Sequence, residues 1–213
     1  MKNALFLVTL VLLTLPLMSQ GKKYSKAMQA AVEKMNEATD EAGGLEAAAD
    51  FEKIAQDYPD QWLPPYHAAR ILIFISFDQT ELEHLDALLD RAKKWIVKAE
   101  DLAPEESEIQ VILAMYYIAL ISAEPDTRGP IYYMDVMDAI QKGLVLNPEN
   151  PRAHYMNGMW TLNTPDFMGG GPEAAKPILL ETKQKFQDYK NEDPFWPAWG
   201  EDLNQSDLDR ISE

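Results

Sequence analysis

Cysteine is absent from all 213 residues of the sequence. Its absence excludes disulfide bonds, cysteine-based zinc sites, thiol catalysis and the attachment of lipid to an N-terminal cysteine. Histidine is scarce, with three residues that do not form the HExxH metal-binding pattern, and no G-x-S-x-G nucleophile motif occurs. We therefore predict no enzyme activity, no catalytic residue, no metal site and no cofactor, and we expect an apolar core to provide the stability.

Basic residues are also few, since 19 lysines and arginines stand against 35 acidic residues and give a formal net charge of −16. An acidic surface repels phosphate groups, so nucleic acid and anionic membrane surfaces are poor partners. We interpret the charge as a source of solubility. Attraction of a cationic partner or of metal ions is the alternative, although no local cluster singles out a site.

No apolar run is long enough to cross a membrane. Lys2 precedes an apolar stretch at residues 4–18, which is shorter than a spanning helix and is followed by Ser19, Gln20 and Gly21. This order is typical of a cleaved secretory signal. We predict a signal peptide at residues 1–19, a single domain at residues 20–213, a periplasmic or extracellular location and no stable membrane insertion. An uncleaved anchor is the alternative.

Three segments share a small, large, small pattern at positions i, i+4 and i+7, followed by a proline. They are Ala47-x3-Phe51-x2-Ile54-x4-Pro59, Ala92-x3-Ile96-x2-Ala99-x4-Pro104 and Val136-x3-Ile140-x2-Gly143-x4-Pro148, with a weaker copy at Ala175-x3-Leu179-x2-Thr182. Such residues lie on one face of a helix, where the small ones let a neighbouring helix approach closely. The proline then ends the helix. The pattern predicts an internal repeat of about 44 residues.

A second helical segment precedes each copy after the first, at residues 63–77, 106–122 and 151–163. The stretch IQVILAMYYIALI at residues 109–121 is apolar all round, so we expect this helix in the buried middle of the array. The stretch RILIFISF at residues 70–77 has the composition of a strand, but its place in the repeat favours a helix.

The pattern A-x3-F-x2-A-x4-P resembles the second half of the tetratricopeptide repeat, whereas the first-half pattern W-x2-L-G-x2-Y is degenerate here. The resemblance implies an all-α fold of antiparallel helix hairpins, stacked as a right-handed superhelix of about eight helices with a C-terminal capping segment. The units would cover residues 23–60, 61–105, 106–149 and 150–191, and the cap residues 192–213. Residues 61–69, 147–158 and 164–180 also resemble secreted repeat proteins common in the Bacteroidetes, which implies a signal, a periplasmic helical array and no catalytic residue.

The repeat exceeds the usual 34 residues, and the surplus falls between the two helices of a pair, at residues 78–86, 123–130 and 164–172. Insertions at equivalent positions of a helical array lie on one edge. We expect these three to build a rim over one mouth of a groove, with tolerated length variation as the alternative.

Gly169, Gly170 and Gly171 precede Pro172, which suits the first turn of a helix. A helix start can hold an anion, but the spacing matches no phosphate-binding loop. We expect the glycines to allow a sharp turn while Phe167 tucks under the array. Contact with a ligand is the alternative.

Aromatic and arginine side chains supply the other candidates for binding. The candidate rim and groove residues are Trp62, Tyr66, Arg70, Tyr117, Arg128, Tyr132, Tyr155, Trp160, Phe167, Gly169, Gly170 and Gly171. Most of the aromatic residues belong to the core, and the remainder would line a concave surface. Arg70, Arg128 and Arg152 either pair with acidic neighbours, which we favour, or point at an anionic group in the groove.

The C-terminus carries Phe195, Trp196 and Trp199 within five residues, around Pro197. We expect them to cap the last helix pair, as repeat arrays require, and the alternative is that they fold back across the groove. A short acidic helix is predicted at residues 207–211, starting from Ser206.

These features favour a secreted binding or assembly module that holds a peptide or protein partner in the rimmed groove. The alternative is a small-molecule carrier or transport-accessory protein with an enclosed cleft beneath the loop at residues 169–171.

Overall fold

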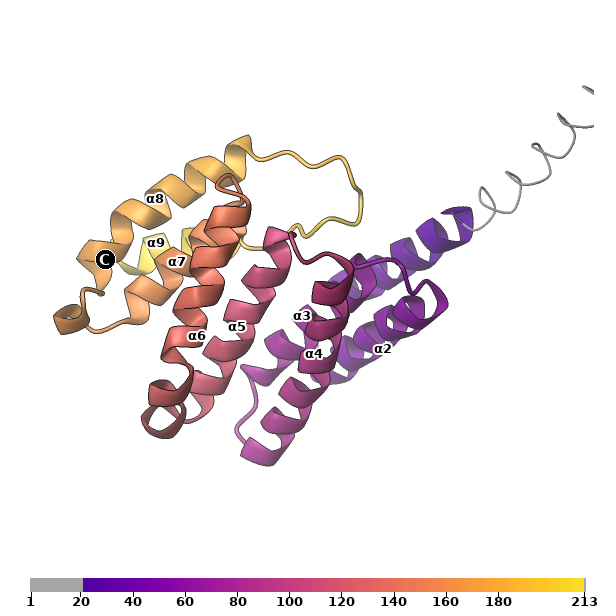
Figure 1. Cartoon of the computed structure of the whole chain (residues 1–213), viewed down its shortest axis with the longest axis horizontal. Helices are drawn as coiled ribbons and strands as arrows, with labels where there is room; N and C mark the ends of the chain where they lie inside the picture. The colour runs from indigo at the N-terminus through magenta and orange to yellow at the C-terminus, as the bar shows by residue number, and fades with distance from the viewer. Residues whose placement is uncertain (1–20, 213) are drawn as a thin grey trace, which may run out of the picture.

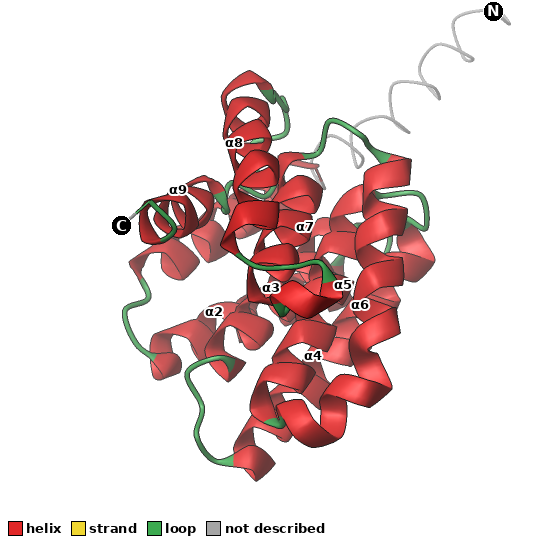
Figure 2. Ribbon diagram, turned by 90° about the vertical axis from the view of Figure 1, so that its left-hand side faces the viewer, coloured by secondary structure: helices red, strands yellow, loops and turns green. Residues whose placement is uncertain are grey.

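The computed structural model describes residues 21–212, so the predicted signal peptide at residues 1–19 lies outside the described part. Residues 21–212 form helices and connecting loops without a strand (Figures 1 and 2). A helix through residues 21–37 is followed by α2 (Glu41–Asp57), α3 (Leu63–Ser76), α4 (Leu82–Leu102), α5 (Ser107–Ala123), α6 (Pro125–Leu146), α7 (Pro151–Asn163), the 3-10 helix η1 (Asp166–Met168), α8 (Pro172–Asp188) and α9 (Glu201–Arg210).

Consecutive helices pack against one another: α2 with α3, α3 with α4, α4 with α5, α5 with α6, α6 with α7, and α7 with α8. The predicted all-α fold of antiparallel neighbours is therefore confirmed. The segments predicted at residues 63–77, 106–122 and 151–163 are α3, α5 and α7. Helix α5 contacts α3, α4, α6 and α7, so it is the buried middle of the array as expected.

The repeat pattern forms the packing stripe of α2, α4, α6 and α8. Every patterned residue of the four copies is buried: Ala47, Phe51, Ile54, Ala92, Ile96, Ala99, Val136, Ile140, Gly143, Ala175, Leu179 and Thr182. Small side chains in this stripe admit the neighbouring helix. Gly158 of α7 shows how close the approach is, because a Cβ there would lie 2.5 Å from Leu179 Cδ2 of α8.

The expected rim of three loops is not formed. Helix α4 begins at Leu82, and α6 begins at Pro125 directly after α5 ends at Ala123, so most of the surplus residues lengthen α4 and α6. Proline suits the first turn of a helix, which explains the early start of α6. Arg128 then joins the N-terminal parts of α6 and α4 through Asp86, with N–O distances of 2.7 and 2.8 Å.

The loop at residues 164–171 turns sharply, as predicted. Gly169 and Gly171 have φ angles of 89° and 93°, a region that other residues rarely adopt. The expectation that Phe167 tucks under the array is wrong, because its side chain is 89 % exposed. The Gly171 N–H donates to Thr161 O at 2.9 Å and closes the loop onto the end of α7, which leaves η1 projecting outward.

Residues 189–200, here called the C-terminal strap, leave α8 and return to α9 (Figure 1). Trp199 contacts Tyr66 of α3, and Trp196 contacts Trp62, the residue just before α3. These two rings therefore reach beyond the last helix pair to an early part of the array. Helix α9 starts after Gly200, earlier than predicted, and it is α9 that packs on α7 and α8.

Candidate functional site: an apolar cavity between α3, α5, α7 and α9

A cavity of about 630 Å³ lies between the C-terminal halves of α3, α5 and α7 and is completed by the strap and α9. Its size falls within the range of small-molecule sites. We call it the apolar cavity, and its lining is Phe74, Phe77, Asp78, Met115, Ile118, Ile121, Ser122, Pro125, Tyr155, Met156, Met159, Trp160, Asn163, Trp199 and Leu203.

Aromatic rings and thioethers form most of the wall. Phe74 and Trp199 meet edge to face with their ring centroids 5.7 Å apart, at the boundary of α3 and the strap. Phe77 and Leu203 stay 44 % and 38 % exposed at the rim, so the cavity opens to solvent over an apolar edge.

The polar groups of the wall are few and mostly engaged. The Tyr155 hydroxyl donates to Asp207 Oδ2 at 3.2 Å. Burial, assisted by the Asp207 charge, raises the pKa of Tyr155 well above its ordinary value, so the phenol is neutral at physiological pH. Trp160 directs its indole N–H at Met137 Sδ at 3.1 Å. The cavity therefore suits a ligand with a largely apolar body.

A buried polar cluster lies at the other ends of the same helices. Arg152 Nε of α7 donates to both carboxylate oxygens of Glu108 of α5, at 2.9 Å each. The Tyr66 hydroxyl of α3 donates to Glu108 Oε2 at 3.3 Å and accepts from Trp199 Nε1 at 3.0 Å. We call Tyr66, Glu108, Arg152 and Trp199 the polar cluster. Trp199 belongs to both sites, because its ring also lines the apolar cavity.

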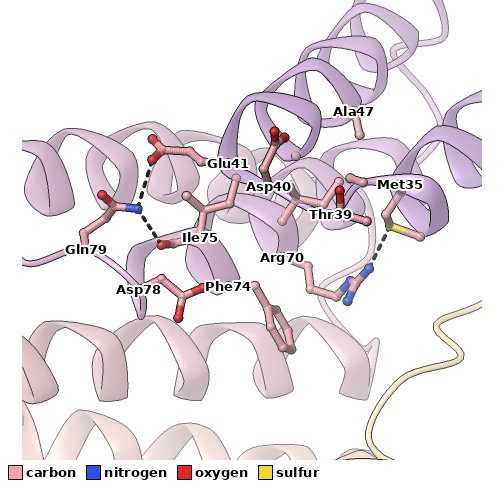
Figure 3. A pocket seen from close by; sticks show the side chains of 13 residues that line it. Met35, Thr39, Asp40, Glu41, Ala47, Arg70, Phe74, Ile75, Asp78 and Gln79 are labelled. Atoms are coloured by element: carbon pink, nitrogen blue, oxygen red, sulfur yellow. Dashed lines mark hydrogen bonds between the residues drawn. The ribbon is translucent and has the colours of Figure 1, made fainter.

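A second cavity, of about 580 Å³, adjoins the first between the end of the helix at residues 21–37, α2 and α3 (Figure 3). We call it the Arg70 cavity. It shares Phe74 and Asp78 with the apolar cavity. Figure 3 shows Arg70 and Met35 at one end, and Glu41 and Gln79 at the other.

The structure brings only some of the predicted site residues together. Tyr155 and Trp160 line the apolar cavity, and Arg70 lines its neighbour. Tyr66 is fully buried in the polar cluster, while Trp62 packs edge to face on Trp196 with centroids 5.3 Å apart.

The remaining candidates lie elsewhere. Tyr117 and Tyr132 stack on each other at 5.8 Å, away from the apolar cavity, and Arg128 is engaged with Asp86. The expected cleft beneath Gly169 and Gly170 has a volume of only about 110 Å³. Gly171 and Phe167 line none of these cavities.

Sequence reasoning missed Phe74, Met115, Met159 and Trp199 as wall residues. Phe74 and Met115 lie in the apolar stretches at residues 70–77 and 109–121, where the sequence singles out only Arg70 and Tyr117 as groove candidates. For Trp199, a cap on the last helix pair is the favoured prediction, with folding across the groove as the alternative. Periodicity shows which residues face inward, but it does not show where the inward faces fail to meet. The strap gave the one indication of the site in the sequence, because three aromatic residues in one turn are expected to pack against another part of the protein.

The histidines stand outside the apolar cavity. His67 Nε2 donates to Phe195 O at 2.8 Å, His84 Nε2 lies 2.5 Å from Glu41 Oε1, and His154 Nε2 lies 2.8 Å from Pro148 O. Residues 21–212 hold no group of three or more histidine, aspartate or glutamate side chains placed to bind a metal ion. Within the same range, each helix is too short or too polar to span a bilayer.

No protein-family model and no curated protein matches the chain. Among solved structures, the chain is similar to the HusA haemophore from Porphyromonas gingivalis. The two share 26 % sequence identity over 90 % of this chain and 94 % of that one, with a TM-score of 0.80. The resemblance thus extends over most of the length of both chains, rather than over one hairpin.

Proposed function

We propose that this protein is a secreted carrier of a flat, largely apolar small molecule of the haem type, and that it holds this ligand in the apolar cavity. The observation that carries the proposal is an aromatic and thioether-lined cavity of about 630 Å³ in a chain that resembles a haemophore along most of its length. Flat aromatic ligands bind well between aromatic side chains.

The wall residues indicate how haem would be held. Proteins bind haem iron through histidine, cysteine, methionine or tyrosine, and no histidine lines the apolar cavity. Tyr155 is neutral and bonded to Asp207, which disfavours it as a ligand. Met115, Met156 and Met159 offer only weak thioether ligation. Stacking and apolar contact therefore supply most of the affinity, and we expect the metal-free porphyrin to bind within about tenfold of haemin.

We also propose that the protein is exported and that its mature part is a single repeat domain. The signal predicted at residues 1–19 would export the chain, and residues 20–213 would form one tetratricopeptide-type array of hairpins. The alternative, a groove for a peptide or protein partner, has less support because most residues of two of the three expected rim loops belong to helices α4 and α6.

Titration of haemin into the purified chain, followed by the Soret band, tests the proposal. Met159→Glu places a charge in the cavity wall and should weaken binding at least about tenfold, because the charge must be desolvated against the ligand. Met134→Glu is the matched control, since Met134 is 63 % exposed on α6 and should leave the affinity unchanged. Absence of haemin binding by the unaltered chain would refute the proposed function. Equal effects of the two variants would place the site elsewhere.

A further inference from the structure

Arg70 differs from the other arginines of the chain in having no carboxylate partner among residues 21–212. The salt bridges are Arg91 to Glu52, Arg128 to Asp86 and Glu124, Arg152 to Glu108, and Arg210 to Asp207. Arg70 forms none within the same residues, although acidic side chains outnumber basic ones by 35 to 19. In so acidic a chain, an arginine without a carboxylate calls for a specific explanation.

Soft, uncharged groups surround the Arg70 guanidinium. Its Nη2 donates to Met35 Sδ at 2.7 Å, and its Cζ lies 5.3 Å from the centroid of the Phe74 ring. Its Nε is buried without a partner among the described residues. Burial lowers the pKa of Arg70, yet arginine keeps its charge in proteins. A thioether is a weak acceptor, so the cation is poorly satisfied by the chain itself.

The guanidinium stands where a bound molecule can reach it. Arg70 lines the Arg70 cavity and also a smaller cavity of about 200 Å³ beneath the strap. His67 Nδ1 and Trp196 Nε1, which are also buried without partners, belong to residues around that smaller cavity. The Arg70 guanidinium lies against the Phe74 ring, and Phe74 also lines the apolar cavity. The cation is therefore close to the apolar cavity.

We infer that Arg70 binds a carboxylate group of the carried ligand while the apolar body of that ligand lies in the apolar cavity. This inference rests on the proposed function. A guanidinium pairs with a carboxylate through two parallel hydrogen bonds, and an aromatic-backed, partly desolvated site strengthens them. The ligand class is thereby narrowed to flat apolar molecules that carry a peripheral carboxylate, as haem does in its propionates.

The acidic residues of the Arg70 cavity limit where the carboxylate can lie. Asp40 Oδ1 accepts from Gly43 N at 2.8 Å, and Glu41 Oε2 accepts from Gln79 Nε2 at 3.3 Å. Asp40 and Glu41 are thus bonded to groups other than Arg70. Asp78 is the third acidic residue of this lining, and Figure 3 shows Glu41 and Asp78 toward the end of the cavity opposite Arg70, with Asp40 between. Their charges repel an anion from that part and favour the Arg70 end.

The test compares haemin with haemin dimethyl ester, which keeps the ring and the iron but loses both carboxylate charges. The unaltered chain should bind haemin roughly tenfold or more tightly than the ester, since a charge-assisted hydrogen-bond pair contributes that much. Arg70→Met should bind both compounds with the affinity that the unaltered chain shows for the ester. Arg70→Lys should keep part of the preference for haemin because it keeps the charge.

Arg91→Met is the matched control, because Arg91 pairs with Glu52 and lines neither cavity. It should preserve the full preference for haemin. Failure of the unaltered chain to bind either compound would refute the proposed function itself. Binding of both compounds with equal affinity, or a preference that survives in Arg70→Met, would refute the role of Arg70 and leave the carrier function standing.

Discussion

The two ends of α3, α5 and α7 are built differently although they belong to the same three helices. At one end the polar cluster is closed: Glu108 is fully buried and Arg152 is 3 % exposed, and each meets the other. At the other end the helices leave the apolar cavity open, with Phe77 exposed at its rim. The closed end fixes the spacing of the helices, so the open end can remain unfilled without collapse of the array.

The largest expected effect comes from opening the closed end. Glu108→Gln leaves Arg152 buried without a counter-charge, and we expect the free energy of unfolding to fall by about 3–5 kcal/mol. Urea denaturation measures this loss. Glu149→Gln, at the exposed pair with Lys185, is the control and should cost less than about 1 kcal/mol. A loss below 1 kcal/mol for Glu108→Gln would show that the cluster does not hold the helices.

A second effect at the closed end depends on pH. Burial lowers the pKa of His67 to about 3, with a smaller contribution from Arg70, while its ordinary value is 6.5. The unfolded chain takes up a proton near pH 6.5 and the folded chain does not, so the free energy of unfolding should fall as the pH drops. We expect a loss of about 2 kcal/mol between pH 7 and pH 5.

The comparison with His67→Gln isolates this contribution, because the glutamine amide keeps a donor for Phe195 O but does not titrate. Denaturation at each pH should give a flatter profile for the variant. Identical pH profiles for the two proteins would contradict the buried, neutral state of His67.

A smaller effect separates the two roles of Trp199. Trp199→Phe keeps a ring in the cavity wall but loses the hydrogen bond to Tyr66, so the free energy of unfolding should fall by about 1 kcal/mol. Trp196→Phe is the matched control, because Trp196 Nε1 has no partner among residues 21–212. Thermal unfolding of both variants measures the difference, and a larger loss for Trp196→Phe would reverse the assignment.

The smallest effect is expected at Arg70. Arg70→Met removes a cation that no carboxylate of the described chain satisfies, so the free energy of unfolding should stay within about 1 kcal/mol or rise. Arg152→Met, which leaves Glu108 unpaired, should cost several kcal/mol in the same urea titration. A comparable loss at both positions would mean that Arg70 is structural.

Local rules predicted the helices well and the site poorly. The stripe of Ala92, Ile96 and Ala99 specified a helix and its buried face, because periodicity is a property of neighbouring residues. Pairs such as Tyr66 and Trp199, 133 residues apart, depend on how the whole array curves. The arginines show the same limit. For Arg70 and Arg152 the sequence allowed either an ion pair with an acidic neighbour or contact with an anionic group in the groove. Only the fold shows that Arg152 pairs with Glu108 and that Arg70 contacts Met35.

The strap also changes how the array is connected. In an open helical array each unit touches only its neighbours, so terminal units can unfold independently. Here His67 Nε2 donates to Phe195 O across 128 residues of chain, which joins an early helix to the segment that follows the last hairpin. Helix α3 and the C-terminal strap, although distant in sequence, must therefore unfold together. The protein should unfold in one cooperative step and fold slowly for its helical content, because its closing contacts have a long sequence separation.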